Sequence, residues 1–138
     1  MYPGEGITIV NGRVYMLTWK EKTMLIFDAH SLDVRLVFCN SFKYVMLTSV
    51  DMTYHQLLGS VTYTTHTGEG WGIAFDGTHL VVSDGSEYLT FFELPTHDRQ
   101  ESLHRVREVP VVDTVSNRHV RRINELEIIN GYIYTNIW

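Results

Sequence analysis

Side chains that could form a binding pocket recur along this chain of 138 residues. Indole rings supply flat apolar surfaces, and carboxylates and side-chain amides can form hydrogen bonds with a bound molecule. Whether these groups meet depends on the elements that carry them. The residues concerned are Trp19, Trp71 and Trp138, the glutamates Glu5, Glu69 and Glu125, and Asn124.

Three hairpins of one design carry these residues. Each joins two apolar strands through an Asn-Gly or Asp-Gly dipeptide, and each has a glutamate about six residues before the turn. Such dipeptides accept the positive φ angles that a tight type I′ turn requires at both central positions. The expected strand pairs are 4–10 with 14–19, 68–75 with 80–83, and 123–129 with 132–138.

Further strands extend the first two hairpins into sheets. Third strands are expected at 24–27 and 88–94, and fourth strands near 34–38 and 106–112. Four-stranded antiparallel units that repeat every 40–50 residues or so are typical of β-propeller blades. The sequence therefore predicts an all-β chain of about two and a half propeller blades, with a β-solenoid or a β-sandwich as the alternative.

The repeats divide the chain unevenly. We expect a first blade over 1–36, an insert-like segment over 37–60, a second blade over 61–122 and a partial blade over 123–138. The segment 37–60 shows less clear alternation and no turn residues at the expected places. A loop inserted between blades and a stretch foreign to the fold both explain it.

Composition excludes several classes of function. The net charge is −5 without a dense basic tract, which argues against nucleic-acid binding. No apolar run is long enough to span a bilayer, and no signal peptide is expected at the start. The single Cys39 excludes an internal disulfide and is expected to be a buried thiol. The seven histidines lack the spacing of metal ligands.

Taken together, the motifs resemble the plant and bacterial glutaminyl cyclases, whose fold is a five-bladed β-propeller. The resemblance covers most of the chain except about 37–60. The blocks that carry it are Gly4-Glu5-Gly6-Ile7-Thr8, Glu69-Gly70-Trp71-Gly72-Ile73, Ser83-Asp84-Gly85-Ser86, Asn124-Glu125-Leu126-Glu127 and Asn136-Ile137-Trp138.

The resemblance implies glutaminyl-peptide cyclotransferase activity, an acyltransferase reaction that needs no cofactor. The substrate is a peptide or protein with an N-terminal glutamine, which becomes pyroglutamate as ammonia leaves. Members of the family are commonly secretory or exported, and this chain carries no signal that would place it. The alternative is a non-catalytic binding or scaffold module derived from a propeller, which could self-associate through its open sheet edges.

The resemblance also implies roles for single residues. Trp19, Trp71 and Trp138 would bind substrate as pocket walls, and Asn124 would be catalytic through a hydrogen bond to the substrate amide or its oxyanion. The alternative for the three tryptophans is packing in a core, and the alternative for Asn124 is hydrogen bonding to the backbone at a strand end. The acid/base glutamate and a lysine of the family are expected before and after this chain, so the chain alone is expected to be inactive.

Two further expectations concern carboxylates. Glu5, Glu69 and Glu125 are expected to point toward the channel of the propeller, where packed carboxylates would raise one another's pKa values. They would either accept hydrogen bonds from amides of neighbouring blades or hold a structural divalent cation. Asp84 is expected to order a turn rather than to act in catalysis.

Overall fold

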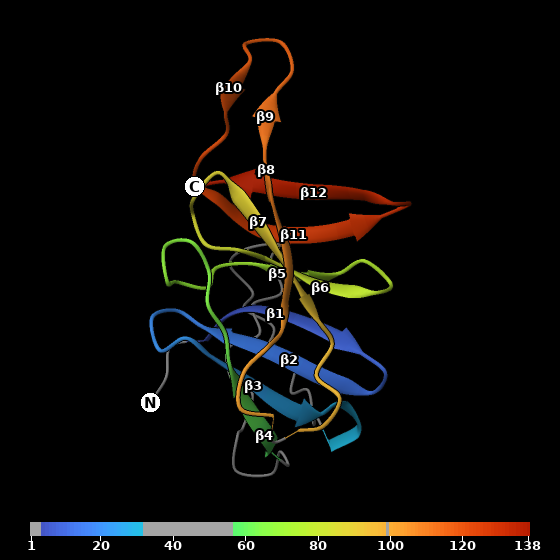
Figure 1. The fold of residues 1–138 in the computed structure, drawn as a ribbon. Coiled ribbons are helices and arrows are strands. Elements are labelled where there is room, and N and C mark those ends of the chain that lie inside the picture. The colour runs from blue at the N-terminus through green and yellow to red at the C-terminus, as the bar shows by residue number, and fades with distance from the viewer. Residues whose placement is uncertain (1–3, 32–56, 99) are drawn as a thin grey trace, which may run out of the picture.

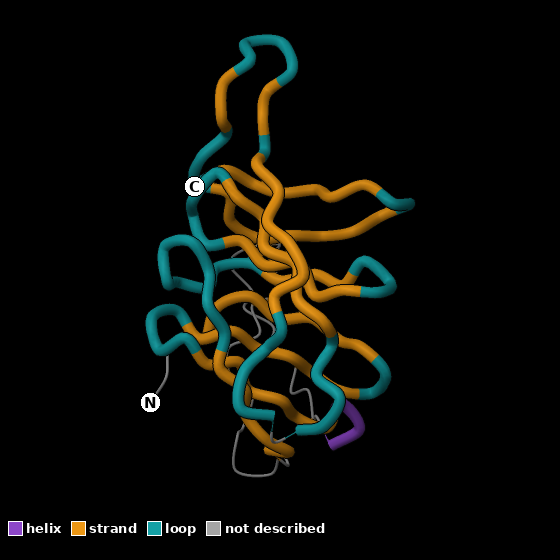
Figure 2. Tube along the Cα trace, viewed as in Figure 1, coloured by secondary structure: helices purple, strands orange, loops and turns teal. Residues whose placement is uncertain are grey.

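The computed structural model describes residues 4–31, 57–98 and 100–138, and its elements are strands apart from a single 3-10 turn at Ala29–Ser31 (Figures 1 and 2). The strands form two four-stranded and two two-stranded sheets, all with antiparallel pairing. This confirms the predicted all-β class. Cys39 and the expected strand at 34–38 lie outside the described residues. In the part that is described, no helix is long and apolar enough to span a membrane.

The first sheet begins with the first predicted hairpin. It contains β1 (Gly4–Val10), β2 (Arg13–Thr18), β3 (Thr23–Asp28) and β4 (Leu57–Thr62), in that order. At the turn, Asn11 and Gly12 have φ angles of 50° and 74°, as the prediction requires.

The fourth strand is a correction. The edge of β3 that faces away from β2 pairs with β4, so residues 57–62 supply the fourth strand of this sheet. The expected domain boundary between residues 60 and 61 falls inside β4. Pairing partners this far apart in sequence leave no local turn signal.

The second sheet contains β5 (Ile73–Phe75), β6 (His79–Ser83), β7 (Tyr88–Glu93) and β8 (Arg105–Pro110), which confirms four strands here. Its first turn differs from the prediction, because Gly77 has a positive φ angle of 97° and Asp76 does not. An Asp76 carboxylate oxygen instead accepts hydrogen bonds from the backbone N–H groups of Thr78 and His79, at 2.7 and 2.6 Å. The carboxylate thus supports a three-residue loop.

Two short sheets complete the described fold. The third predicted hairpin forms β11 (Ile123–Ile129) and β12 (Tyr132–Ile137), with positive φ angles at Asn130 and Gly131. An additional hairpin, which the sequence did not predict, pairs β9 (Val112–Asp113) with β10 (Arg118–His119). Figure 1 shows it projecting beyond the stacked sheets.

The sheets pack face to face, with one buried cluster on each side of the second sheet. Along β6, Leu80 and Val82 join the cluster shared with the first sheet, while Val81 joins the cluster shared with β11. This alternation follows from the two-residue period of a strand. The innermost strands β1 and β11 both contact β5, so one end of each inner strand lies close to the others. This arrangement positions the site.

Candidate active site

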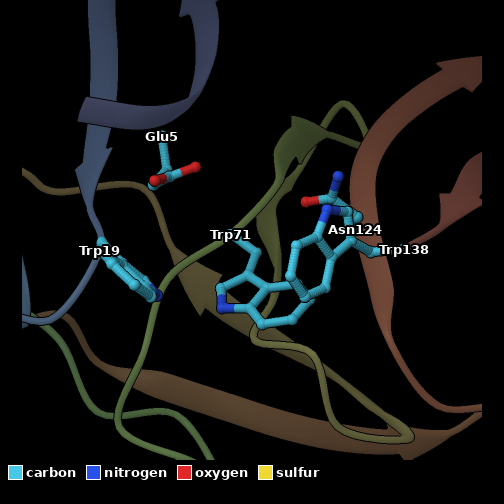
Figure 3. Close-up of a pocket in the computed structure, with 5 residues that line it drawn as sticks. All are labelled: Glu5, Trp19, Trp71, Asn124 and Trp138. Atoms are coloured by element: carbon cyan, nitrogen blue, oxygen red, sulfur yellow. The ribbon is translucent and has the colours of Figure 1, made fainter. Parts of the chain in front are cut away.

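A cavity of about 310 Å³ lies where the three stacked sheets meet (Figure 3). Its lining comes from residues at or beside the ends of strands in each sheet. The structure therefore brings together the four site residues expected from the sequence, and adds one carboxylate. The lining residues are Glu5, Trp19, Trp71, Asn124 and Trp138.

Hairpin register explains why the lining residues come in pairs. Gly4 is opposite Thr18 in the first hairpin, and Ile123 is opposite Ile137 in the third, with a β-bulge following each pair. The next residue on each inner strand is Glu5 or Asn124, and the next on each outer strand is Trp19 or Trp138. A carboxylate and an amide thus occupy equivalent places, each beside an indole.

Glycines let the inner strands approach backbone to backbone. The Gly6 N–H donates to the Trp71 carbonyl at 2.7 Å, and a Cβ atom on Gly6 would lie 2.7 Å from that oxygen. A Cβ atom on Gly72 would overlap the backbone of Asn124 and Glu125. Larger residues would separate the strands, so these glycines hold the cavity walls together.

The tryptophans are partly exposed walls rather than buried core residues. Trp19 is 38% exposed and Trp138 is 75% exposed. The rings of Trp71 and Trp138 meet edge to face, with centroids 5.8 Å apart and an angle of 81° between the planes. Gly85 packs directly against the Trp71 ring, since a Cβ atom on Gly85 would come within 2.6 Å of that ring. Binding of substrate by these walls stays a prediction.

Asn124 is held through its backbone. The Ser83 hydroxyl donates to the Asn124 carbonyl at 2.5 Å and accepts a hydrogen bond from the Gly72 N–H at 2.9 Å. Ser83 is fully buried, so this hydroxyl fastens β11 to the second sheet. The Asn124 side chain remains at the cavity (Figure 3). Sequence reasoning noted Ser83 only as part of a motif, and a catalytic role for Asn124 stays a prediction.

The three glutamates do not share one environment. Glu5 lines the cavity, whereas one Glu69 oxygen accepts hydrogen bonds from the Trp19 and Trp71 indoles, both at 2.8 Å. Glu125 accepts a hydrogen bond from the Leu126 N–H at 3.3 Å, and the Ile73 N–H of the neighbouring sheet also favours its charged form. Partial desolvation of the carboxylate raises the pKa of Glu125, although the residue as a whole is exposed; the two N–H groups oppose the rise, and the neighbouring charges of Glu127 and Glu5 add to it.

The predicted bonding to amides of a neighbouring blade stays a prediction, which the effect of the Ile73 N–H on the pKa of Glu125 supports. Among the described residues, no group of three or more His, Cys, Asp or Glu side chains is placed to hold a metal ion. A structural cation in the channel stays a prediction.

Asp84 orders a turn, as predicted. One carboxylate oxygen accepts from the N–H and hydroxyl groups of Ser86, at 3.0 and 2.5 Å. The other accepts from the Thr67 N–H at 2.7 Å. Asp84 is 2% exposed, and its two oxygens join this turn to the loop that carries Glu69.

Sequence reasoning placed Glu5 at the channel but gave it no catalytic role, because the family's acid/base glutamate is expected in an upstream blade; the structure adds that Glu5 lines the cavity. A signal was present. With the turn fixed at Asn11-Gly12, antiparallel pairing alone places Glu5 at the same end of the hairpin as Trp19.

Comparisons with known proteins identify the family. A family model described as glutamine cyclotransferase matches residues 1–44 and 34–138. Glutaminyl-peptide cyclotransferase from Arabidopsis thaliana is 28% identical over 137 residues, which are 99% of this chain and 32% of that protein. A crystal structure of Myxococcus xanthus glutaminyl cyclase matches with a TM-score of 0.68 and 30% identity, over 98% of this chain and 44% of that one. The sheets are thus propeller blades, and the chain spans about a third of the curated relative.

Proposed function

The chain belongs to the glutamine cyclotransferase family, and we propose that it forms the substrate pocket of a glutaminyl-peptide cyclotransferase. In this reaction the α-amine of an N-terminal glutamine attacks its own side-chain amide carbon. A carbon–nitrogen bond closes the ring, the amide carbon–nitrogen bond breaks, and ammonia leaves. The observation that carries the proposal is one cavity lined by a carboxylate, an amide and three indoles from three blades.

The size and walls of the cavity suit one glutaminyl residue. About 310 Å³ lies at the small end of the range for ligand pockets. Flat indole walls restrict the rotamers of an unbranched side chain, which favours the bent conformer in which amine and amide carbon meet. Such preorganisation accounts for much of the acceleration in ring closure.

Glu5 is the group that would move the proton. As the amine attacks, it must lose a proton, and the departing nitrogen must gain one to leave as ammonia. A single carboxylate within reach of both nitrogens can take the first proton and deliver the second. Glu5 lies on β1 beside Trp19, and Figure 3 shows it apart from Asn124, with Trp71 between them.

Asn124 would stabilise the oxyanion that forms on the attacked carbon. Its side-chain amide can donate a hydrogen bond, and its backbone is fixed by the Ser83 hydroxyl. Donors held in place before the reaction stabilise developing charge without the cost of reorganising solvent. Proton carrier and oxyanion donor therefore come from different blades, and the reaction as proposed needs no cofactor.

The binding test uses the chain's own tryptophans. All three line the cavity, so intrinsic fluorescence reports on it. We expect a peptide that begins with glutamine to change the fluorescence in a saturable way. The same peptide with an acetylated α-amine or an initial alanine should bind at least about tenfold more weakly. Equal responses to all three peptides would contradict the proposal.

The turnover test uses a hybrid enzyme, in which this chain replaces the matching segment of the Myxococcus xanthus protein. We expect the hybrid to form pyroglutamate, followed by mass spectrometry. Glu5→Gln and Asn124→Ala should each slow turnover about 100-fold or more. Glu101→Gln, at an exposed position outside the cavity, is the control. Peptide binding without turnover by the unsubstituted hybrid would favour the alternative of a non-catalytic binding module.

A further inference from the structure

Two walls of the cavity share one hydrogen-bond acceptor. The indole N–H groups of Trp19 and Trp71 both donate to the same carboxylate oxygen of Glu69, each at 2.8 Å. Trp19 follows β2 of the first blade and Trp71 precedes β5 of the second. In Figure 3 the nitrogen ends of these two indoles face each other. Glu69 thus connects the walls of two blades.

These bonds fix how the rings are turned. An indole has one donor, so anchoring its N–H selects one orientation of the ring about its side-chain torsions. Hydrogen bonds to an ionised carboxylate are shorter and stronger than those between neutral groups. Because both N–H groups point to Glu69, the walls that Trp19 and Trp71 present to the cavity consist mainly of ring carbons.

Glu69 is itself held in place by its loop. Its carbonyl accepts from the Thr65 hydroxyl at 2.6 Å, and its N–H donates to the Thr67 hydroxyl at 3.3 Å. The Thr67 N–H in turn donates to the buried Asp84 at 2.7 Å. The next residue, Gly70, donates its N–H to the Trp19 carbonyl at 2.9 Å. The carboxylate therefore has a fixed backbone from which to hold the rings.

We propose that Glu69 is a positioning residue that locks the Trp19 and Trp71 walls in the orientation that folds the substrate for ring closure. Glu69 is not among the residues that line the cavity, so it acts through the two indoles. The consequence for the reaction rests on the proposed function. The claim that Glu69 fixes the two indole rings does not rest on the proposed function, and it can be tested in the chain without substrate.

The first experiment records the indole N–H signals of 15N-labelled chain by NMR and assigns them with Trp→Phe variants. Glu69→Met keeps the length of the side chain but removes the carboxylate, whereas Glu69→Gln keeps an oxygen acceptor. We expect the Trp19 and Trp71 signals to move upfield in Glu69→Met and less far in Glu69→Gln, while the Trp138 signal, whose ring only contacts Trp71, moves least. Unchanged Trp19 and Trp71 signals in both variants would overturn the inference.

Two controls separate positioning from loss of the fold. Glu101→Met makes the matched change at an exposed site, and all three signals should stay in place. If Glu69→Met fails to fold, Glu69→Gln carries the test, because an amide oxygen is a weaker acceptor and should still shift two signals out of three. A shift of all three signals alike would also count against the inference.

The second experiment measures kinetics in the hybrid enzyme. Glu69→Met should lower kcat about tenfold or more, and Glu69→Gln should recover most of that loss, since misplaced groups are costly in ring-closing reactions. Moved indole signals with unchanged kcat would refute the positioning role. A hybrid that never binds or converts glutamine peptides would instead contradict the proposed function, and the NMR result would stand by itself.

Discussion

At the scale of single residues, the two polar groups of the cavity occupy equivalent positions in different hairpins. Glu5 and Asn124 each follow the residue that pairs with the outer strand, and each lies beside a tryptophan. Glu125 is one position further along β11 than Asn124, so it does not match Glu5, and its carboxylate faces the Ile73 N–H instead. The apparent repeat of glutamates in the sequence is therefore out of register by one residue, which reverses the face of a strand.

The raised pKa of Glu125 leads to a pH prediction. The folded protein holds this proton more tightly than the unfolded chain, whose glutamates titrate near pH 4.3 or so. As the pH rises from about 4 through the folded-state pKa, the contribution of Glu125 to stability falls, because deprotonation is harder in the folded state. Glu125→Gln should lack this fall and gain stability relative to the unsubstituted chain as the pH approaches 7.

Thermal unfolding of both proteins at pH 4, 5, 6 and 7 measures this difference. Glu101→Gln is the matched control, since its side chain is exposed and its charge is not among those that raise the pKa of Glu125. A melting-temperature difference that does not change with pH would contradict the prediction.

At the scale of elements, the inner strands are held by glycines and by one hydroxyl. Ser83, at the end of β6, bonds both Gly72 and Asn124, so β5, β6 and β11 meet at one buried atom. The backbone of Gly72 lies so close to the backbone of Asn124 and Glu125 that there is no room for a side chain at position 72. The position of Asn124 thus depends on β6 as well as on its own hairpin.

Ser83→Ala tests this connection. Removing the hydroxyl leaves the Gly72 N–H and the Asn124 carbonyl without their bond to it. We expect the free energy of unfolding, measured in urea, to fall by about 1–3 kcal/mol. Ser116→Ala, which removes an exposed hydroxyl bonded to Asp113, should cost less than about 1 kcal/mol. Equal losses in the two variants would show that Ser83 contributes no more than a surface hydroxyl.

At the scale of the whole molecule, one of the described sheets is two-stranded and exposed. Among the described strands, β12 pairs with β11 alone, and all six of its residues are exposed. Tyr134 is 55% exposed, and Tyr132 and Ile137 add further apolar surface. An unpaired strand edge with an apolar face can pair with another chain.

We therefore predict that the chain associates in solution through β12, as the sequence led us to expect of an open sheet edge. Tyr134→Lys places a charge on this strand and should raise the monomer fraction in analytical ultracentrifugation. Val115→Lys, which replaces a 94% exposed residue on the β9–β10 hairpin, is the control and should have little effect. The prediction is wrong if both variants, or neither, change the monomer fraction.

The sequence by itself determined the three hairpins that carry the inner strands, the third strands and four of the five lining residues. Turn dipeptides and two-residue alternation act between near neighbours, so Asn11-Gly12 and Asn130-Gly131 could be located without coordinates. Only the tertiary structure decided that β4 comes from residues 57–62, that Glu5 enters the cavity, and that Glu69 bonds two indoles. The β3–β4 pairing joins segments far apart in sequence, and the cavity and the indole bonds join residues on different blades, so no local spacing encodes these contacts.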